Sequence, residues 1–169
     1  MTAPRVLAHR GANRMAPENT LEAFIAAGAL GADGVELDVH RTASGALVVH
    51  HDAAARGLGV LAERPAAEIR AARPEIPTLE EALEACTGML VNIEVKNLPG
   101  DADYDPAEGV AAAVVDLLTR RRRRDDVLVS SFDLASADRV RALDSSIPTC
   151  ARLQVTPPSR RSHAHTSSE

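Results

Sequence analysis

Residues 34–39, Gly-Val-Glu-Leu-Asp-Val, constrain the fold most, because apolar and acidic side chains alternate along them. In an extended strand, neighbouring side chains point to opposite faces. The three aliphatic side chains therefore share one face, and Glu36 and Asp38 share the other. Such a strand needs a packed layer against its apolar face and a reason for two carboxylates to lie side by side.

A second stretch, Val-Asn-Ile-Glu-Val-Lys at residues 91–96, repeats this pattern and adds Glu94 and Lys96 to the polar side. Burying like charges together is unfavourable unless a cation lies among them. Carboxylate oxygens are the ligands of hard divalent cations. The two stretches predict a divalent metal site formed by Glu36, Asp38 and Glu94. The alternative is a solvated strand face with local salt bridges.

Strand and helix signals alternate along the chain. Asn19 or Thr20 can cap the first helix, Thr78 opens a capping box with Glu81, and Asp105 precedes a proline at the first helical position. The expected strands are residues 5–9, 34–39, 46–50, 91–96, 127–131 and 149–155, and the expected helices are residues 21–30, 66–72, 78–86, 105–124 and 134–143.

This alternation predicts an α/β fold with parallel strands joined by helical crossovers. The residues suited to chemistry lie at or near the C-terminal ends of the expected strands, where parallel α/β barrels build their active sites. A doubly wound sheet would also gather them there, but the glycine-rich phosphate loop of that fold is missing.

Bulk properties exclude several classes of protein. The chain has 169 residues and a net charge of -5, which argues against a general nucleic-acid binder. It has neither a signal-peptide pattern nor an apolar run approaching the roughly 20 residues of a membrane helix. We therefore expect a cytoplasmic protein without stable membrane insertion. Cys86 and Cys150 have no motif around them and are expected to be small core residues.

The composition changes near residue 157. Residues 1–156 are expected to form one domain, whereas residues 157–169 consist mostly of Pro, Ser, Arg and His. Such a segment lacks the apolar side chains that a packed element needs, so a disordered C-terminal tail is predicted.

Seven motifs in residues 5–153 resemble those of the glycerophosphodiester phosphodiesterases, in the same order and at similar spacing. They are His9-Arg10-Gly11, Pro17-Glu-Asn-Thr20, Glu36-x-Asp38, His51-Asp52, Pro77-Thr-Leu-Glu-Glu-Ala-Leu83, Glu94-x-Lys96 and Ser130-Ser-Phe132.

The resemblance implies a TIM-type (β/α)8 barrel that is incomplete, with five or six of its eight strands, as in a C-terminally truncated member. It also implies hydrolysis of glycerophosphodiesters to sn-glycerol 3-phosphate and an alcohol. The implied roles are metal ligands for Ca²⁺ or Mg²⁺ at Glu36, Asp38 and Glu94, acid and base at His9 and His51, and phosphate binding at Arg10 and Lys96.

General chemistry agrees with these roles. Cations around the nonbridging oxygens favour attack on a negatively charged phosphodiester. Breaking a phosphorus–oxygen bond to an alcohol also needs a proton donor and an acceptor, and two histidines can serve as both. The residues leave open whether water or the substrate's own hydroxyl attacks.

Two other functions stay open. A full (β/α)8 barrel takes about 250 residues, so the chain can instead be a catalytically inactive truncated fragment whose open sheet edges favour self-association. A related phospholipase-type phosphodiesterase is the other alternative.

Overall fold

The computed structural model describes residues 4–123 and 125–152. Their main sheet contains five parallel strands in the order β1, β2, β6, β7, β8, with β3 antiparallel to β2. The strands are β1 (Leu7–His9), β2 (Gly34–Arg41), β3 (Leu47–Val49), β6 (Leu90–Val95), β7 (Val127–Ser131) and β8 (Thr149–Ala151).

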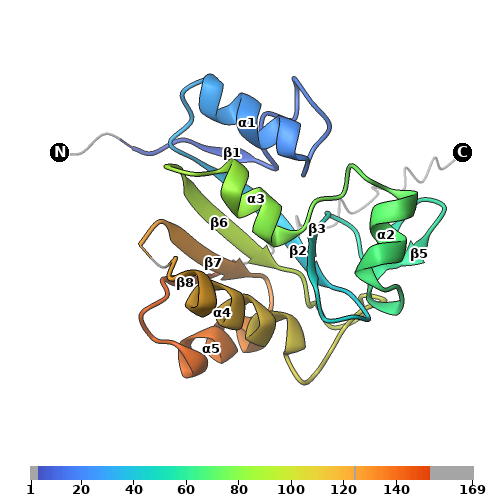
Figure 1. The fold of residues 1–169 in the computed structure, drawn as a ribbon. Coiled ribbons are helices and arrows are strands. Elements are labelled where there is room, and N and C mark those ends of the chain that lie inside the picture. Colours follow the sequence, from blue (N-terminus) through green and yellow to red (C-terminus); the bar gives the residue numbers. More distant parts are fainter. Residues whose placement is uncertain (1–3, 124, 153–169) are drawn as a thin grey trace, which may run out of the picture.

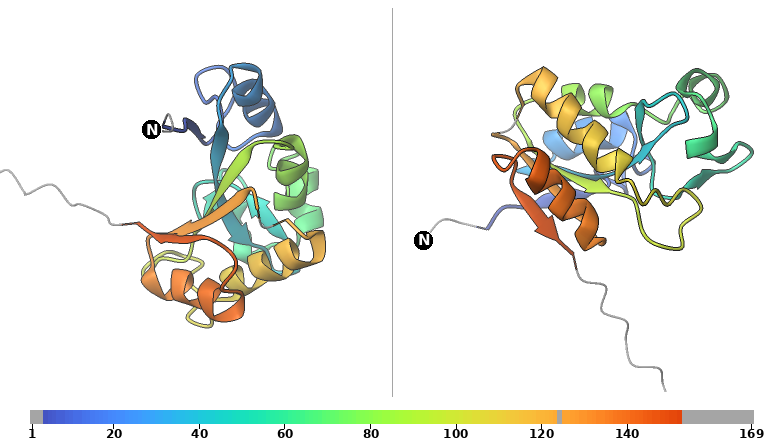
Figure 2. Two further views of the ribbon diagram at one scale, coloured as in Figure 1. Left: turned by 90° about the vertical axis from the view of Figure 1, so that its left-hand side faces the viewer. Right: turned by 90° about the horizontal axis from the view of Figure 1, so that it is seen from below.

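The helices lie on the convex side of this sheet, and the strands form an open arc (Figures 1 and 2). In the described residues β1 and β8 are the outer parallel strands, and they do not pair with each other. The helices are α1 (Leu21–Ala29), α2 (Ala66–Ala72), α3 (Leu79–Ala85), α4 (Gly109–Arg121) and α5 (Leu134–Leu143).

The hydrophobic core fills the space between the helices and the apolar face of the sheet. Val35, Leu37 and Val39 of β2 are fully buried there. They belong to one cluster with Phe24 of α1 and Leu118 of α4. The predicted division of β2 into an apolar and an acidic face is therefore confirmed.

The parallel register places the two acidic strands side by side. Asp38 of β2 lies opposite Glu94 of β6, and Glu36 lies opposite both Asn92 of β6 and His9 of β1. Because strand partners of this kind share a face of the sheet, the register gathers the predicted metal ligands on the side away from the helices.

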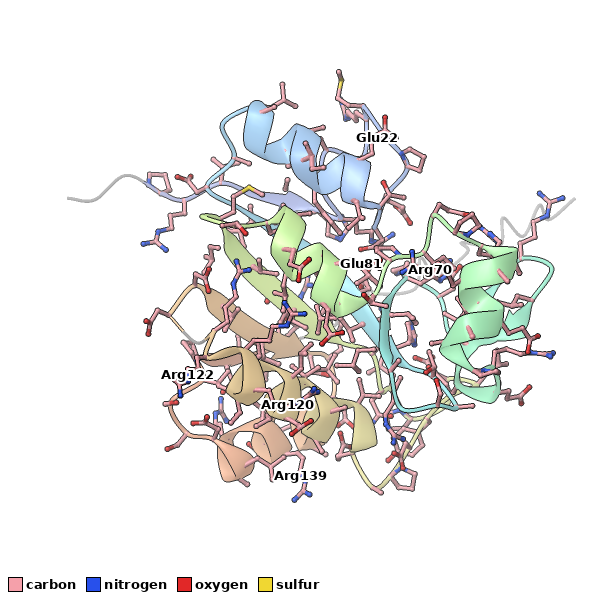
Figure 3. The ribbon with its side chains drawn as sticks, in the orientation of Figure 1. Glu22, Arg70, Glu81, Arg120, Arg122 and Arg139 are labelled. Atoms are coloured by element: carbon pink, nitrogen blue, oxygen red, sulfur yellow. The ribbon has the colours of Figure 1, made fainter. Side chains whose placement is uncertain are left out.

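Two of the predicted helix starts are confirmed by their caps. Thr20 caps α1 by accepting a hydrogen bond from the Ala23 backbone, which decides between Asn19 and Thr20. Thr78 and Glu81 form the expected capping box at α3. Glu81 also pairs with Arg70 of α2 (Figure 3), so the same carboxylate joins the two helices.

The predicted helix start at Asp105 is wrong. The Asp105 carboxylate accepts hydrogen bonds from the backbone N–H groups of Ala107 and Gly109, at 2.9 and 3.0 Å. Glu108 takes a left-handed conformation with φ 58. The aspartate therefore closes a turn, and helix α4 begins at Gly109.

Two further expectations need correction. β3 is antiparallel to β2, because only a short loop joins the two strands and they form a hairpin. Residues 52–64, which lie outside the strands and helices expected from the sequence, include the two-stranded sheet of β4 (Ala54–Ala55) and β5 (Gly59–Val60) and a 3-10 turn at Leu61–Glu63.

The two cysteines differ. Cys86 is buried as predicted, and its burial raises the pKa of the thiol to about 12. Cys150 is exposed, so its prediction as a core residue is wrong: it lies on the outer strand β8, which has a neighbour only on its β7 side within the described residues.

The predicted tail at residues 157–169 and the expected strand residues 153–155 lie outside the described residues. Within the described part, no helix has the length and apolar character to cross a membrane.

Candidate active site

The carboxylates of Glu36, Asp38 and Glu94 form a buried cluster at the end of the parallel strands. Their residues are 5%, 1% and 3% exposed. One oxygen atom from each of the three lies within 4.8 Å of the others. Burial, the charge of Asp38 and the charge of Glu94 raise the pKa of Glu36 to about 7. The cluster is therefore short of positive charge near neutral pH.

These three residues fit a divalent cation. Hard cations such as Ca²⁺ and Mg²⁺ are bound through oxygen atoms, with carboxylates as the usual charged ligands. A bound ion would favour the ionised form of Glu36, which burial beside two other carboxylates disfavours. The structure thus brings together Glu36, Asp38 and Glu94, the three residues that the sequence predicts as metal ligands.

Arg10 and Lys96 reach this cluster from two different strands. Arg10 follows β1, and its Nε lies 3.2 Å from Asp38 Oδ2 while its Nη1 donates to Glu18 at 3.0 Å. Lys96 follows β6, and its Nζ donates to Glu94 Oε1 at 3.2 Å and lies 3.6 Å from Asp38 Oδ1. Both predicted phosphate-binding residues therefore contact the acidic cluster.

The turn after β1 depends on Gly11. Arg10 has φ 56 and Gly11 has φ 79, so both residues are in the left-handed region. A Cβ atom on Gly11 would lie 2.7 Å from the Ala23 carbonyl carbon of α1. The backbone N–H of Arg10 donates to the Glu36 backbone oxygen at 2.9 Å and to Glu36 Oε2 at 3.1 Å. This tight turn aims Arg10 at the carboxylates.

His9 and His51 lie at the edge of the same site. His9 Nε2 is 3.8 Å from Glu36 Oε2, and the His9 side chain is 57% exposed. His51 Nδ1 lies 2.7 Å from Asp52 Oδ1. The neighbouring His50 instead contacts the Asp52 backbone.

A cavity of about 250 Å³ joins these groups. Six of the seven predicted site residues line it, all except Glu36, and Leu98, Phe132 and Arg152 complete the lining. Phe132 belongs to a motif noted in the sequence without an assigned role. Arg152 follows the outer strand β8, and the sequence pattern carried no signal for it.

Asn19 is a further site residue that sequence reasoning placed differently. It is 3% exposed, and its Nδ2 donates to Asp38 Oδ2 at 2.9 Å. Its Oδ1 accepts from the Asp38 backbone N–H at 3.4 Å. The side chain considered as a helix cap therefore fixes the orientation of a predicted metal ligand.

His40 is a second buried residue near the site that the sequence pattern did not indicate. It is 1% exposed and occupies the same face of β2 as Glu36 and Asp38. Its Nδ1 lies 2.5 Å from Asp103 Oδ2, and its Nε2 lies 3.3 Å from the backbone oxygen of His51. The two-residue period of β2 puts His40 on this face, but its partner Asp103 is 63 positions away in the sequence.

Comparison with known proteins identifies the family of the chain. The model of the glycerophosphoryl diester phosphodiesterase family matches residues 9–168. The chain belongs to this family. A glycerophosphodiester phosphodiesterase of Caldanaerobacter subterraneus is 36% identical over an alignment of length 145, which covers 76% of this chain and 58% of that protein.

Solved structures of family members share the fold. A phosphodiesterase of Oleispira antarctica in complex with the product sn-glycerol-3-phosphate has a TM-score of 0.79 at 32% identity, over 92% of this chain and 68% of that chain. The glycerophosphodiester phosphodiesterase of Thermotoga maritima has a TM-score of 0.69 at 34% identity, over 82% of this chain and 58% of that chain.

The matched relatives are longer than this chain, which spans 58% of the Caldanaerobacter protein. The prediction of an incomplete (β/α)8 barrel is confirmed, because the described residues contribute five parallel strands in an open arc with helices on the outside. In the glycerophosphodiester phosphodiesterase fold, the carboxylates, both histidines and the basic residues thus gather at the C-terminal ends of the strands, where barrel enzymes place their active sites.

Proposed function

We propose that this chain hydrolyses glycerophosphodiesters to sn-glycerol 3-phosphate and an alcohol, with Ca²⁺ or Mg²⁺ as cofactor. The observation that carries the proposal is a single cavity lined by two histidines, two carboxylates of the acidic cluster and the two basic residues predicted to bind phosphate. The similarity to a phosphodiesterase solved with sn-glycerol-3-phosphate supports the choice of substrate.

Glu36, Asp38 and Glu94 are the proposed metal ligands. A divalent cation at this position supplies positive charge that stabilises the charge developing on phosphoryl oxygens. Arg10 and Lys96 are proposed to bind the nonbridging oxygens of the phosphodiester, since both line the cavity and carry fixed positive charge. A guanidinium group binds phosphate oxygens through two parallel hydrogen bonds, whereas a lysine acts as a point charge.

His9 and His51 are the proposed acid and base. Hydrolysis needs one group to take the proton from the attacking hydroxyl and another to give a proton to the leaving alcohol. With the Nδ1–H of His51 donated to Asp52, its Nε2 stays available for proton transfer. The exposed His9 ring, near Glu36, is the second group able to exchange a proton with substrate in the cavity.

The test is the release of sn-glycerol 3-phosphate from glycerophosphocholine by the purified chain. We expect EDTA and Glu36→Ala each to abolish the release. Activity that survives both treatments would refute the proposed metal site. His51→Gln should lower turnover by about 10²- to 10⁴-fold, the usual contribution of an acid–base residue. His50→Gln is the matched control and should leave turnover near that of the unchanged protein.

The inactive-fragment alternative rests on the open sheet and on the share of the relatives that the chain spans. Cooperative melting together with turnover would reject it. Lipid and deacylated substrates, compared side by side, separate the phospholipase alternative from the proposed activity.

Two expectations stay predictions. Self-association through the open edges is one, because β1 and β8 each pair with one strand within the described residues. Size-exclusion chromatography at several protein concentrations tests it. The cytoplasmic location is the other.

A further inference from the structure

The Arg152 side chain reaches into the acidic cluster from the end of the outer strand β8. Its backbone N–H donates to the Ser131 oxygen at 2.8 Å, which fixes the start of the side chain beside β7. Its Nη1 contacts Glu94 Oε2 and lies 3.4 Å from Glu36 Oε1. One guanidinium nitrogen therefore bridges two of the three proposed metal ligands.

The position of this guanidinium group is supported by an aromatic ring. The Arg152 guanidinium carbon lies 4.8 Å from the centre of the Phe132 ring. A cation over the face of a phenyl ring is attracted by the ring quadrupole. Both side chains line the cavity of the site. Arg152 thus has a defined place in the cavity rather than a random surface position.

Arg152 is one of three cations that four carboxylates share. Arg10 contacts Asp38 and Glu18, Lys96 contacts Asp38 and Glu94, and Arg152 contacts Glu36 and Glu94. Glu36 and Glu94 are also two of the three carboxylates that could hold a metal ion. The Arg152 guanidinium group and a metal ion therefore compete for the same carboxylates, so one of them must yield.

Arg152 is the cation best placed to yield. Its side chain is 34% exposed, compared with 19% for Arg10 and 12% for Lys96. Arg10 is also tied to Glu18 through its guanidinium and to Glu36 through its backbone. Arg152 extends from a strand that pairs only with β7 among the described residues. Its displacement would break its contacts with Glu36, Glu94 and Phe132 and expose the least buried of the three cations.

We propose that Arg152 is an internal competitor of the divalent cation, which pairs with Glu36 and Glu94 when the ion is absent and is released from them when the ion binds. The inference rests on the proposed function only for the class of the competing ion. If Arg152 competes in this way, two features set the affinity of the site for metal. One is the set of three ligands, and the other is an arginine that lies outside the seven motifs of the sequence.

The test measures metal affinity without substrate. Isothermal titration calorimetry of the full chain with CaCl₂ and with MgCl₂ compares the unchanged protein with Arg152→Gln. We expect tighter binding to the variant by about 3- to 10-fold, since an ion pair with a partly exposed arginine contributes roughly 1 kcal/mol and 1.4 kcal/mol is tenfold. Equal or weaker binding to Arg152→Gln would overturn the proposal.

Arg120→Gln is the matched control, because Arg120 makes an ion pair with Asp116 on the outer face of α4, away from the cluster (Figure 3). Its metal affinity should equal that of the unchanged protein. Arg152→Lys keeps the positive charge and should bind metal more weakly than Arg152→Gln. If Arg152→Gln does not fold, Arg152→Lys is compared with the unchanged protein instead, and it should bind metal more tightly, because a lysine lacks the guanidinium fork that binds carboxylates.

Thermal melting gives an independent readout. In EDTA, Arg152→Gln should melt below the unchanged protein, because two buried carboxylates lose a cation. With saturating ion the difference between the two melting midpoints should shrink or reverse. If Arg152 had only a structural role, its substitution would lower the midpoint equally with and without the ion.

The proposed function and the competition by Arg152 can fail separately. Tighter ion binding by Arg152→Gln without release of sn-glycerol 3-phosphate refutes the proposed function alone, and no saturable ion binding in any variant refutes both.

Discussion

The polar face of β2 contains two groups of buried ionisable side chains with different partners. At one end His40 is matched by one carboxylate, Asp103, at 2.5 Å, and both side chains are at most 2% exposed. Two positions earlier, Asp38 lies beside Glu36 and Glu94, and these neighbours together with burial raise the pKa of Glu36 to about 7. The same strand face therefore contains a paired site and a site with excess negative charge.

The difference between the His40–Asp103 pair and the carboxylate cluster indicates which of them stabilises the fold and which binds a ligand. A buried polar group with its partner in place contributes to a unique fold, and removing one partner leaves an uncompensated group. Buried carboxylates with shared cations have the opposite property, because a ligand of positive charge relieves their repulsion. We infer that the His40 end serves the fold and that the Glu36 end serves ligand binding, and four predictions test this difference.

The largest expected effect follows from breaking the paired site. His40→Ala leaves Asp103 buried without its partner, and breaking a buried pair in this way destabilises a protein by about 3–5 kcal/mol. Urea denaturation should show this loss of unfolding free energy with and without Ca²⁺. His40→Gln, which keeps a hydrogen-bond donor, should lose less. A loss below about 1 kcal/mol for His40→Ala would contradict the pairing.

The second prediction has the opposite sign. Glu36→Gln keeps the size of the side chain and removes one of three neighbouring negative charges. At pH 8 the metal-free protein should gain up to about 3 kcal/mol of unfolding free energy, the equivalent of a pKa raised from 4.5 to about 7. The increase of the melting midpoint with Ca²⁺ or Mg²⁺ should disappear at the same time.

The control for this gain is Glu84→Gln. Glu84 lies on α3 with its side chain 66% exposed and pairs with Arg121. Removing this exposed charge should change stability by less than about 1 kcal/mol and leave the response to metal intact. A loss of metal-free stability in Glu36→Gln would show that the excess charge is already neutralised.

The third prediction concerns the support of Asp38. Asn19→Gly removes the amide that donates to Asp38 Oδ2 and suits the left-handed backbone of that residue, which has φ 57. Removing a residue that orients a metal ligand lowers metal affinity about 10- to 100-fold. Calorimetric titration measures this loss. Asn13→Ala, which removes an amide bound to the His9 backbone, should leave the affinity unchanged.

The sequence predicts the Glu36 end of the strand face better than the His40 end. The alternation of residues 34–39 settles which side chains face the helices, and the strand order then places Asp38 opposite Glu94. Both steps depend on local periodicity and on the general geometry of parallel sheets. The carboxylate cluster could therefore be predicted without knowledge of any loop.

The missed contacts depend on loops. Asp103 reaches His40 from the segment before α4, and Arg152 reaches Glu94 from the end of β8. The position of Asp103 depends on the turn that Asp105 closes just after it. The sequence pattern instead predicted that a helix starts at Asp105. Local capping signals cannot distinguish these two uses of an aspartate, since both satisfy the same backbone N–H groups.

The smallest expected effect is a pH dependence of stability in the metal-free protein. The pKa of Glu36 is raised to about 7 from 4.5, mainly by burial and then by Asp38 and Glu94. Between these two values the folded protein binds more protons than the unfolded chain, so unfolding free energy falls as pH rises. Urea denaturation in EDTA should show a decrease on the order of 1 kcal/mol between about pH 6 and 7.5.

Glu36→Gln tests whether this slope belongs to the carboxylate cluster, because it removes the raised group without touching His40 or Asp103. Its stability should change less over the same pH interval. Saturating Ca²⁺ should flatten the slope of the unchanged protein as well, since an ion that binds the ionised carboxylates offsets the repulsion that raises the pKa. A slope that persists in Glu36→Gln would assign the titration to the histidines instead, and the difference between the two ends of the β2 face would then lie in their packing rather than in their charge.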